Sequence, residues 1–168
     1  MQKSSVEAIV KALEDAGARY LIAGGLAVVA HGYVRFTADV DLILDLEEGN
    51  VRRAIAALAD LGYRPRAPVP ISQFADPLAR RDWVREKGLT VFSLFSEQHP
   101  ATEIDLFVEL PLDFGDAHRA ALRLDVGSQV VATFVGFDDL VALKRQAGRP
   151  QDMMDIDQLR IIKGQSQP

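Results

Sequence analysis

The alternation of apolar and polar residues along this chain predicts helices and strands in mixed order. Near the N-terminus, Val6, Ile9, Val10 and Leu13 recur at the three- and four-residue spacing of a helix that buries one face. Short apolar runs bounded by glycine or acidic residues predict buried strands instead. Over the first 62 residues, the pattern predicts helices at 5–16, 26–31 and 51–61 and strands at 20–23 and 40–44.

The rest of the chain continues this mixture. Three prolines within 63–70 predict an extended crossing or edge segment. Further helices are predicted at 71–87 (broken near Pro77), 137–146 and 151–163, and further strands at 89–95, 104–108 and 130–135, the first two as antiparallel neighbours. The stretch 111–127 carries no clear pattern. The order of elements predicts an α+β fold, with a central mixed sheet, helices packed on it and helices at the C-terminus.

Length and composition narrow the class of protein. A chain of 168 residues with 48% hydrophobic residues can bury one core, and we expect a single domain over 1–163 and a disordered tail over 164–168. Without cysteine, disulfides and thiolate metal sites are excluded, which fits a cytoplasmic protein. No apolar run approaches a membrane span, and the N-terminus lacks the apolar core of a signal peptide.

The net charge of −5 argues against nucleic-acid binding through bulk charge. A local basic patch could still bind nucleic acid, although the basic residues of each candidate patch could also simply be solvated surface residues. The candidates are Arg64 with Arg66, Arg80 with Arg81, and Lys144 with Arg145 and Arg149.

The chemistry of the chain is concentrated in two acidic strands. Asp39 and Asp41 stand two residues apart, so a strand presents both carboxylates on one face. In the later segment Glu103 to Phe107, the same alternation turns Ile104 to the core and Asp105 to the site. Neighbouring carboxylates repel, and one or two Mg²⁺ ions shared with substrate phosphates would remove that cost. Asp105 is also the candidate base for an incoming hydroxyl.

Four more residues are candidates for contacts to a nucleotide. Gly24 and Gly25 join a strand to a helix, where glycine lets the backbone approach a phosphate. Arg35 and Thr37 precede the acidic pair and could contact triphosphate oxygens, although Arg35 could equally be a surface cation.

Together these residues resemble a known family. Gly24-Gly25, the stretch from Arg35 to Leu42 and the stretch from Glu103 to Leu106 are similar to the nucleotidyltransferase superfamily related to DNA polymerase beta. The nearest group contains bacterial minimal nucleotidyltransferases, aminoglycoside and lincosamide nucleotidyltransferases, and abortive-infection AbiEii-type toxins. The C-terminal stretch from Leu143 to Asp155 also resembles the AbiEii-type proteins.

The resemblance implies transfer of a nucleoside monophosphate from a nucleoside triphosphate to a hydroxyl, with release of pyrophosphate. It implies that Asp39, Asp41 and Asp105 hold Mg²⁺, that Gly24 and Gly25 cradle the phosphates, and that Lys144 contacts the nucleotide. The chain departs from many members in one respect, since Gly25 stands where they carry serine.

Several alternatives stay open from the sequence. An inactive or regulatory protein of the same fold, such as a toxin–antitoxin partner, is the main rival, and a metal-dependent phosphohydrolase is a weaker one because the three histidines are scattered. A small molecule, a protein or a tRNA end could be the acceptor, and a homo-oligomer is compatible with the chain. Lys144 could be a surface cation, and Asp152 and Asp155 could be helix N-terminal charges.

Overall fold

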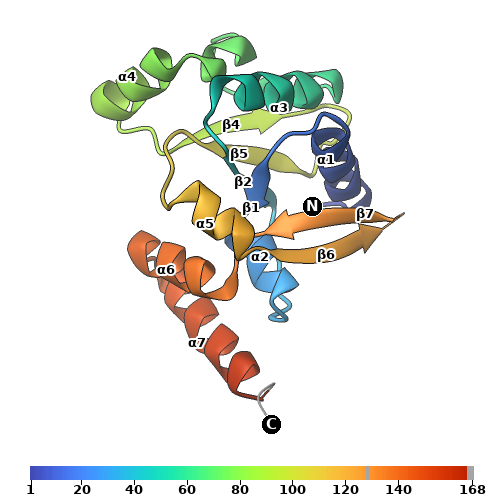
Figure 1. Ribbon diagram of the computed structural model, residues 1–168, viewed down its shortest axis with the longest axis vertical. Coiled ribbons are helices and arrows are strands. Elements are labelled where there is room, and N and C mark those ends of the chain that lie inside the picture. Colours follow the sequence, from blue (N-terminus) through green and yellow to red (C-terminus); the bar gives the residue numbers. More distant parts are fainter. Residues whose placement is uncertain (128, 166–168) are drawn as a thin grey trace.

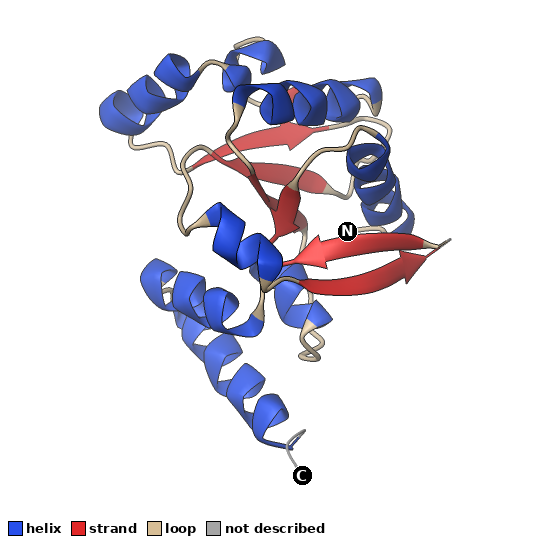
Figure 2. Ribbon diagram, viewed as in Figure 1, coloured by secondary structure: helices blue, strands red, loops and turns tan. Residues whose placement is uncertain are grey.

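The computed structural model describes residues 1–127 and 129–165 and contains one mixed sheet with helices packed on it (Figures 1 and 2). The strands are β1 (Tyr20–Ile22), β2 (Asp39–Leu44), β3 (Arg64–Pro65), β4 (Val91–Phe95), β5 (Glu103–Phe107), β6 (Leu122–Gly127) and β7 (Val130–Phe134). The α-helices are α1 (Lys3–Asp15), α2 (Gly24–Ala30), α3 (Glu48–Asp60), α4 (Pro77–Lys87), α5 (Phe114–Arg119), α6 (Phe137–Ala147) and α7 (Pro150–Gln165), and η1 (Ile71–Ala75) is a 3₁₀ helix.

The seven strands of the sheet lie in the order β3-β4-β5-β2-β1-β7-β6. The pairs β2–β5 and β1–β7 are parallel, and the other neighbours are antiparallel. The predicted mixed sheet is therefore confirmed, as is the antiparallel pairing of β4 with β5. Figure 1 shows α6 and α7 together at the C-terminal end of the chain, away from α1 and α3.

One face of the sheet is closed by apolar packing. Val40 and Leu42 on β2 and Ile104 and Leu106 on β5 are fully buried. Asp39 and Asp41, and the three residues of β5 that alternate with its buried pair, are half-buried. On β4, Phe92 follows the same rule and stacks on Trp83 at 5.0 Å between ring centroids. The acidic residues of β2 and β5 therefore lie on the other, more open face.

The predicted elements differ from the observed ones in a few places. Helix α2 begins at Gly24, so the two glycines form its first turn instead of preceding it. The unassigned stretch 111–127 contains α5 and β6, which are short or largely exposed and so give no apolar periodicity. The predicted helix at 71–87 is divided into η1 and α4, with the Asp76 side chain capping α4. Helix α7 continues through Gln165, past the predicted start of the tail, and residues 166–168 lie outside the described part.

Within the described residues, no helix is both long enough and apolar enough to cross a membrane. Two of the three histidines have close polar partners. His31 Nε2 lies 2.9 Å from the Val135 carbonyl oxygen, and His99 Nδ1 lies 2.9 Å from Ser5 Oγ.

A buried asparagine fixes the strands beside the acidic face. Asn50 lies in the first turn of α3 and is 2% exposed. Its side chain accepts a hydrogen bond from the Arg19 N–H and donates to the carbonyls of Arg19 and Asp45. These two residues flank the start of β1 and the end of β2. Asn50 thus ties α3 to the antiparallel pair that carries the diglycine and the acidic pair.

Asn50→Ala is expected to lower the free energy of unfolding by about 2–3 kcal/mol, because the Arg19 N–H and the Arg19 and Asp45 carbonyls each lose a hydrogen bond to a buried side chain. Urea denaturation measures the change. Arg52→Ala on the same helix is the control, since its exposed ion pair with Glu48 is worth about 0.5 kcal/mol or less. Equal effects of the two substitutions would contradict this role for Asn50.

Candidate active site

The acidic residues of β2 and β5 are held side by side by the register of two parallel strands. Asp41 pairs with Asp105, and Asp39 pairs with Glu103. Side chains at paired positions of neighbouring strands lie on the same face of the sheet. Four carboxylates from two distant segments thus share one surface, and Asp41 and Asp105 are direct neighbours.

Gly24 lies directly against Asp41. Its φ of +60° is a conformation that other residues rarely adopt, and a Cβ atom there would overlap Asp41 Oδ2. The backbone closes the contact from the other side, since the Ala23 N–H donates to the Asp41 carbonyl at 2.9 Å. The turn and the carboxylate therefore form one unit in which only glycine fits.

Gly25 has a second close neighbour in Thr37. A Cβ at Gly25 would overlap Thr37 Oγ1 and lie 2.8 Å from Thr37 Cβ. The hydroxyl of Thr37 therefore occupies the space beside the turn that a side chain at Gly25 would fill. A side chain at Gly25 would therefore need a smaller residue than threonine at position 37.

The grouping of carboxylates has an electrostatic cost. Burial, together with the charges of Asp105 and Asp39, raises the pKa of Asp41 from 3.8 to about 6, while Lys144 and Arg149 act in the opposite direction. Burial and the charges of Asp105 and Glu103 also raise the pKa of Asp39. A positive charge bound at this face would relieve both carboxylates.

A pocket of about 680 Å³ opens beside Asp41 and Asp105. One end is polar and is lined by Gly24, the two aspartates, Lys144 and Arg149. The rest is largely apolar and is formed by side chains of α4, β4, β5, α6 and the segment after β5, among them Val84, Val91, Phe107, Leu110, Leu140 and Leu143. A cavity of this volume suits a nucleotide-sized molecule with one charged and one apolar end.

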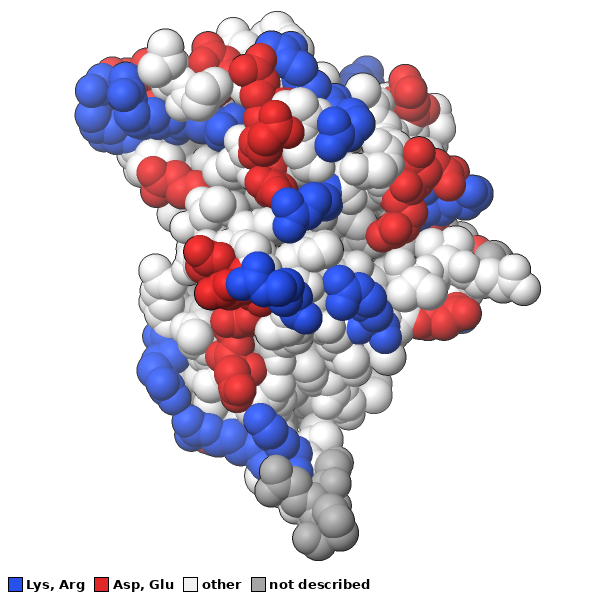
Figure 3. All heavy atoms as spheres, in the orientation of Figure 1, with Lys and Arg blue, Asp and Glu red and all other residues white. Residues whose placement is uncertain are grey.

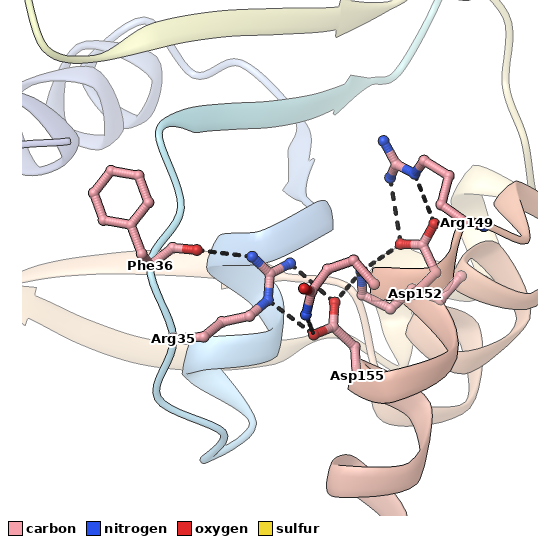
Figure 4. Close-up of polar contacts among 7 residues, drawn as sticks. Arg35, Phe36, Arg149, Asp152 and Asp155 are labelled. Atoms are coloured by element: carbon pink, nitrogen blue, oxygen red, sulfur yellow. Dashed lines mark hydrogen bonds and ion pairs between the residues drawn. The ribbon is translucent and has the colours of Figure 1, made fainter.

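A buried ionic network closes the polar end of the pocket. Lys144 Nζ lies 2.9 Å from Asp152 Oδ1 and 2.7 Å from Asp155 Oδ2, and all three side chains are at most 4% exposed. Arg35 donates to Asp155 at 2.9 Å from the loop before β2, and the exposed Arg149 donates to Asp152 at 2.7 Å (Figure 4). The network joins α6, α7 and that loop into one support.

The hydrogen bonds of this network outweigh the cost of burial. Burial alone would raise the pKa values of Asp152 and Asp155, but hydrogen bonds from Arg149 and Lys144 to the first, and from Lys144, Gln151 and Arg35 to the second, hold both pKa values below the ordinary range. Both carboxylates are therefore charged partners of the cations around them.

A protein-family model described as a nucleotidyltransferase of unknown function (DUF6036) matches residues 4–166, nearly the whole chain. The chain belongs to this nucleotidyltransferase family. Family membership implies a nucleotide substrate, and the mixed sheet with C-terminal helices is consistent with a nucleotidyltransferase domain. A search of curated proteins finds no significant match.

In this nucleotidyltransferase-family chain, the predicted site residues fall into two groups. Gly24, Asp41, Asp105 and Lys144 line the pocket. Asp39, Gly25, Arg35 and Thr37 lie outside its lining. The Arg35 guanidinium is engaged with Asp155 and with the Phe36 carbonyl, and Lys144 is buried between two aspartates, so neither is the exposed surface cation that the sequence left open.

The donor atoms around Asp41 fit Mg²⁺ in their chemistry. Mg²⁺ is a hard cation that proteins usually hold through one or two carboxylates together with substrate phosphates and water. Asp41 and Asp105 are such a pair, and their mutual repulsion favours a cation. Within the described residues, no three His, Cys, Asp or Glu side chains converge into a metal cage. The two carboxylates therefore fit a Mg²⁺ ion whose remaining ligands would come from a bound triphosphate and water.

Charged side chains elsewhere on the protein are mixed. Figure 3 shows basic side chains over α4 and along α6 and α7, with a band of acidic side chains between them. Of the basic candidates, Arg80 and Lys144 are buried, and Arg64 and Arg66 are paired with Glu97 and Glu103. The described surface in this view offers no continuous positive face.

Sequence reasoning did not single out Ser93, and it named Arg66 only as part of a basic patch. Ser93 Oγ on β4 donates to Asp105 Oδ1 at 2.5 Å. Arg66 donates to Glu103 and holds the pKa of that carboxyl below its ordinary value. The signal for Ser93 was the alternation within β4, which turns Phe92 and Leu94 inward and Ser93 to the face of Asp105.

Gly25→Ala is expected to destabilise the protein by about 1–3 kcal/mol, because the added methyl group meets Thr37 in a packed place. Adding Thr37→Gly removes the overlapping atoms, so the double variant should be more stable than the sum of the two single effects by about 1 kcal/mol or more. Thermal and urea unfolding of the four proteins give this coupling. Gly115→Ala in α5 is the control, since its Cβ would have no neighbour closer than 3.4 Å. Strictly additive effects would contradict the contact.

The raised pKa of Asp41, about 6 against 3.8, predicts how stability changes with pH. The folded protein binds this proton more tightly than the unfolded chain, so stability falls as pH rises from about 4 to about 6 and stays lower above that. Asp41→Asn should therefore be more stable than the wild type at pH 8 without metal, by up to about 3 kcal/mol, since one pKa unit corresponds to about 1.4 kcal/mol. The difference should shrink as pH falls through 6 towards 4.

Unfolding curves at pH 8, 6 and 4.5 with a chelator present measure this effect. Asp157→Asn, at an exposed position of α7, is the matched control and should show no such gain. An Asp41→Asn protein less stable than the wild type at pH 8 would show that Asp41 is not under electrostatic strain.

Proposed function

We propose that this protein is a Mg²⁺-dependent nucleotidyltransferase that transfers a nucleoside monophosphate from a nucleoside triphosphate to a hydroxyl acceptor. The observation that carries the proposal is the register pairing of Asp41 with Asp105, both of which line a nucleotide-sized pocket with basic groups at the same end. The family to which the chain belongs supports the proposal at the level of a nucleotide substrate.

The pocket suggests how the nucleotide lies. The triphosphate would occupy the polar end, beside Gly24, Arg149 and the aspartates, and the base and ribose would lie against the apolar side chains of β5 and α6. Gly24 and Gly25 would let the backbone approach the phosphates. Lys144 would act mainly through its charge, because Asp152 and Asp155 already hold its ammonium group.

Asp41 and Asp105, with Asp39 further along the same face, would hold one or two Mg²⁺ ions together with the substrate phosphates. The metal would supply Lewis-acid polarisation of the α-phosphate and stabilise the leaving oxygen. Asp105 would accept the proton of the acceptor hydroxyl. The hydroxyl oxygen forms a bond to the α-phosphorus, the bond from that phosphorus to the bridging oxygen breaks, and pyrophosphate leaves with the bonding electrons. Arg149 would offset the negative charge of the departing group.

The acceptor could be a small molecule, a protein or a tRNA end, since each offers a hydroxyl for the same chemistry. The C-terminal Lys144, Arg149 and Asp152 support a likeness to the AbiEii-type group, for which a toxin of a cytoplasmic toxin–antitoxin pair would be the corresponding biological role. Incubation with labelled ATP, CTP, GTP or UTP and mixtures of proteins, tRNA and small molecules identifies the acceptor by where the label appears.

Asp41→Asn and Asp105→Asn are each expected to lower Mg²⁺-dependent pyrophosphate release by about 10²–10⁴-fold, because each removes a group that acts on the reacting atoms. Calorimetry should show nucleoside triphosphate binding by the wild type with Mg²⁺ and weak binding with a chelator. Asp125→Asn, three strands away from β2 on β6, is the control and should keep wild-type turnover.

Two results would contradict the proposed function. The first is no binding of any of the four nucleotides in the presence of Mg²⁺. The second is full turnover by Asp41→Asn, which would mean that the paired carboxylates do not carry the chemistry.

A further inference from the structure

We infer that Ser93 is a positioning residue for Asp105, an inference that rests on the proposed function. Ser93 on β4 is the direct antiparallel partner of Asp105 on β5. Side chains of such a pair stand on the same face of the sheet with their Cβ atoms about 5 Å apart. Ser93 Oγ donates a hydrogen bond to Asp105 Oδ1 at 2.5 Å, within the short range that is typical of a hydroxyl bound to a carboxylate.

Packing does not explain a serine at this position. Its neighbours Phe92 and Leu94 fill the closed face, and the two other β4 residues on its own face are Val91 and Phe95, types that strands favour. Ser93 is the polar exception on this face of β4. Among the described residues, its hydroxyl is hydrogen-bonded to Asp105.

The hydrogen bond opposes a specific force. Asp105 lies beside Asp41, and two neighbouring carboxylates repel each other, so an unrestrained Asp105 side chain would rotate away. Holding Oδ1 fixes the rotamer of Asp105 and leaves Oδ2 as the oxygen for the reaction. A shift of about 1 Å in a reacting group can cost about a hundredfold in rate.

The support of Ser93 is itself rigid. Its carbonyl accepts a hydrogen bond from the Arg66 N–H at 3.0 Å on one side, and its strand pairs with β5 on the other. The hydroxyl is therefore carried on the backbone of an interior strand. Groups on strands hold a reacting partner more precisely than groups on loops.

The first measurement tests the positioning without relying on turnover. In protein labelled with ¹³C at the aspartate carboxyl carbons, the Asp105 resonance, assigned with Asp105→Asn, should move in Ser93→Ala and return towards its wild-type position in Ser93→Thr, which keeps the hydroxyl. The control Ser96→Ala removes another buried serine hydroxyl just after β4 and should leave the Asp105 resonance in place. An Asp105 resonance that does not respond to Ser93→Ala would overturn the inference.

The second measurement tests the consequence for the reaction. Ser93→Ala should lower kcat for pyrophosphate release about 10–100-fold, the effect typical of a group that orients a ligating carboxylate, with KM for the nucleotide changed less than about threefold. Ser93→Thr should recover most of the loss, and Ser93→Ala should add no further loss in an Asp105→Asn background. Full turnover by Ser93→Ala would overturn the inference, and so would a Ser93→Thr protein as slow as Ser93→Ala. In either case an active wild type would leave the proposed function intact.

Ser93 could instead be the acceptor of its own nucleotidyl group, because its hydroxyl lies within reach of the candidate base. Intact-mass analysis after incubation with nucleoside triphosphate and Mg²⁺ should show no adduct on the wild type. A stable nucleotidyl adduct at Ser93 would overturn the positioning role. A wild type with no turnover would instead refute the proposed function. The ¹³C resonance of Asp105 would then be the measurement that tests whether Ser93 positions this carboxylate.

Discussion

The repulsion between Asp41 and Asp105 is the constraint on which the rest of this structure depends. Two parallel strands place these carboxylates side by side on a partly covered face, where their charges cannot be separated by water alone. A protein could avoid the cost with a neutral residue at either position. This chain instead surrounds the pair with compensating features: the nearby charges of Lys144 and Arg149, the hydrogen bond from Ser93 and the close fit of Gly24. Lys144 and Arg149 lower the pKa of Asp41, the Ser93 hydroxyl holds Asp105, and Gly24 leaves room for the Asp41 carboxylate.

The C-terminal helices act on this face through buried charge. Lys144 stands between Asp152 and Asp155 where solvent cannot reach, and removing one member of such a group leaves an uncompensated charge that costs about 3–5 kcal/mol. Arg35 extends the same network to the loop that precedes β2 and carries Thr37. The positions of Thr37 and Gly25 are thus linked to residues more than a hundred positions further along the chain.

Much of the fold followed from local sequence pattern, and the reasons for the misses are specific. Strands β2, β4 and β5 were predicted because Val40, Phe92 and Ile104 belong to runs buried on one face, which gives a strong alternation. Strand β6 and helix α5 were not predicted, because β6 is largely exposed and α5 has only six residues. The two acidic strands were found because acidic residues within apolar runs are rare without a function. The antiparallel pairing of β4 with β5 was predicted, but the contact of Ser93 with Asp105 was not, since it depends on the register of that pair. The contact of Arg35 was not predicted either, since its partner Asp155 lies 120 residues away.

That separation of 120 residues also bears on how the protein is made. A chain leaving the ribosome exposes Arg35 and the strands β1 and β2 early, but Asp152 and Asp155 emerge only with α7. Until then Lys144 has no buried partner, and the loop with Thr37 is not fastened against the diglycine turn. The polar end of the pocket therefore takes its final form after nearly all of the described chain has been synthesised. A protein truncated before α7 would carry the acidic strands β2 and β5 without the buried ion pairs that join α6, α7 and the loop before β2.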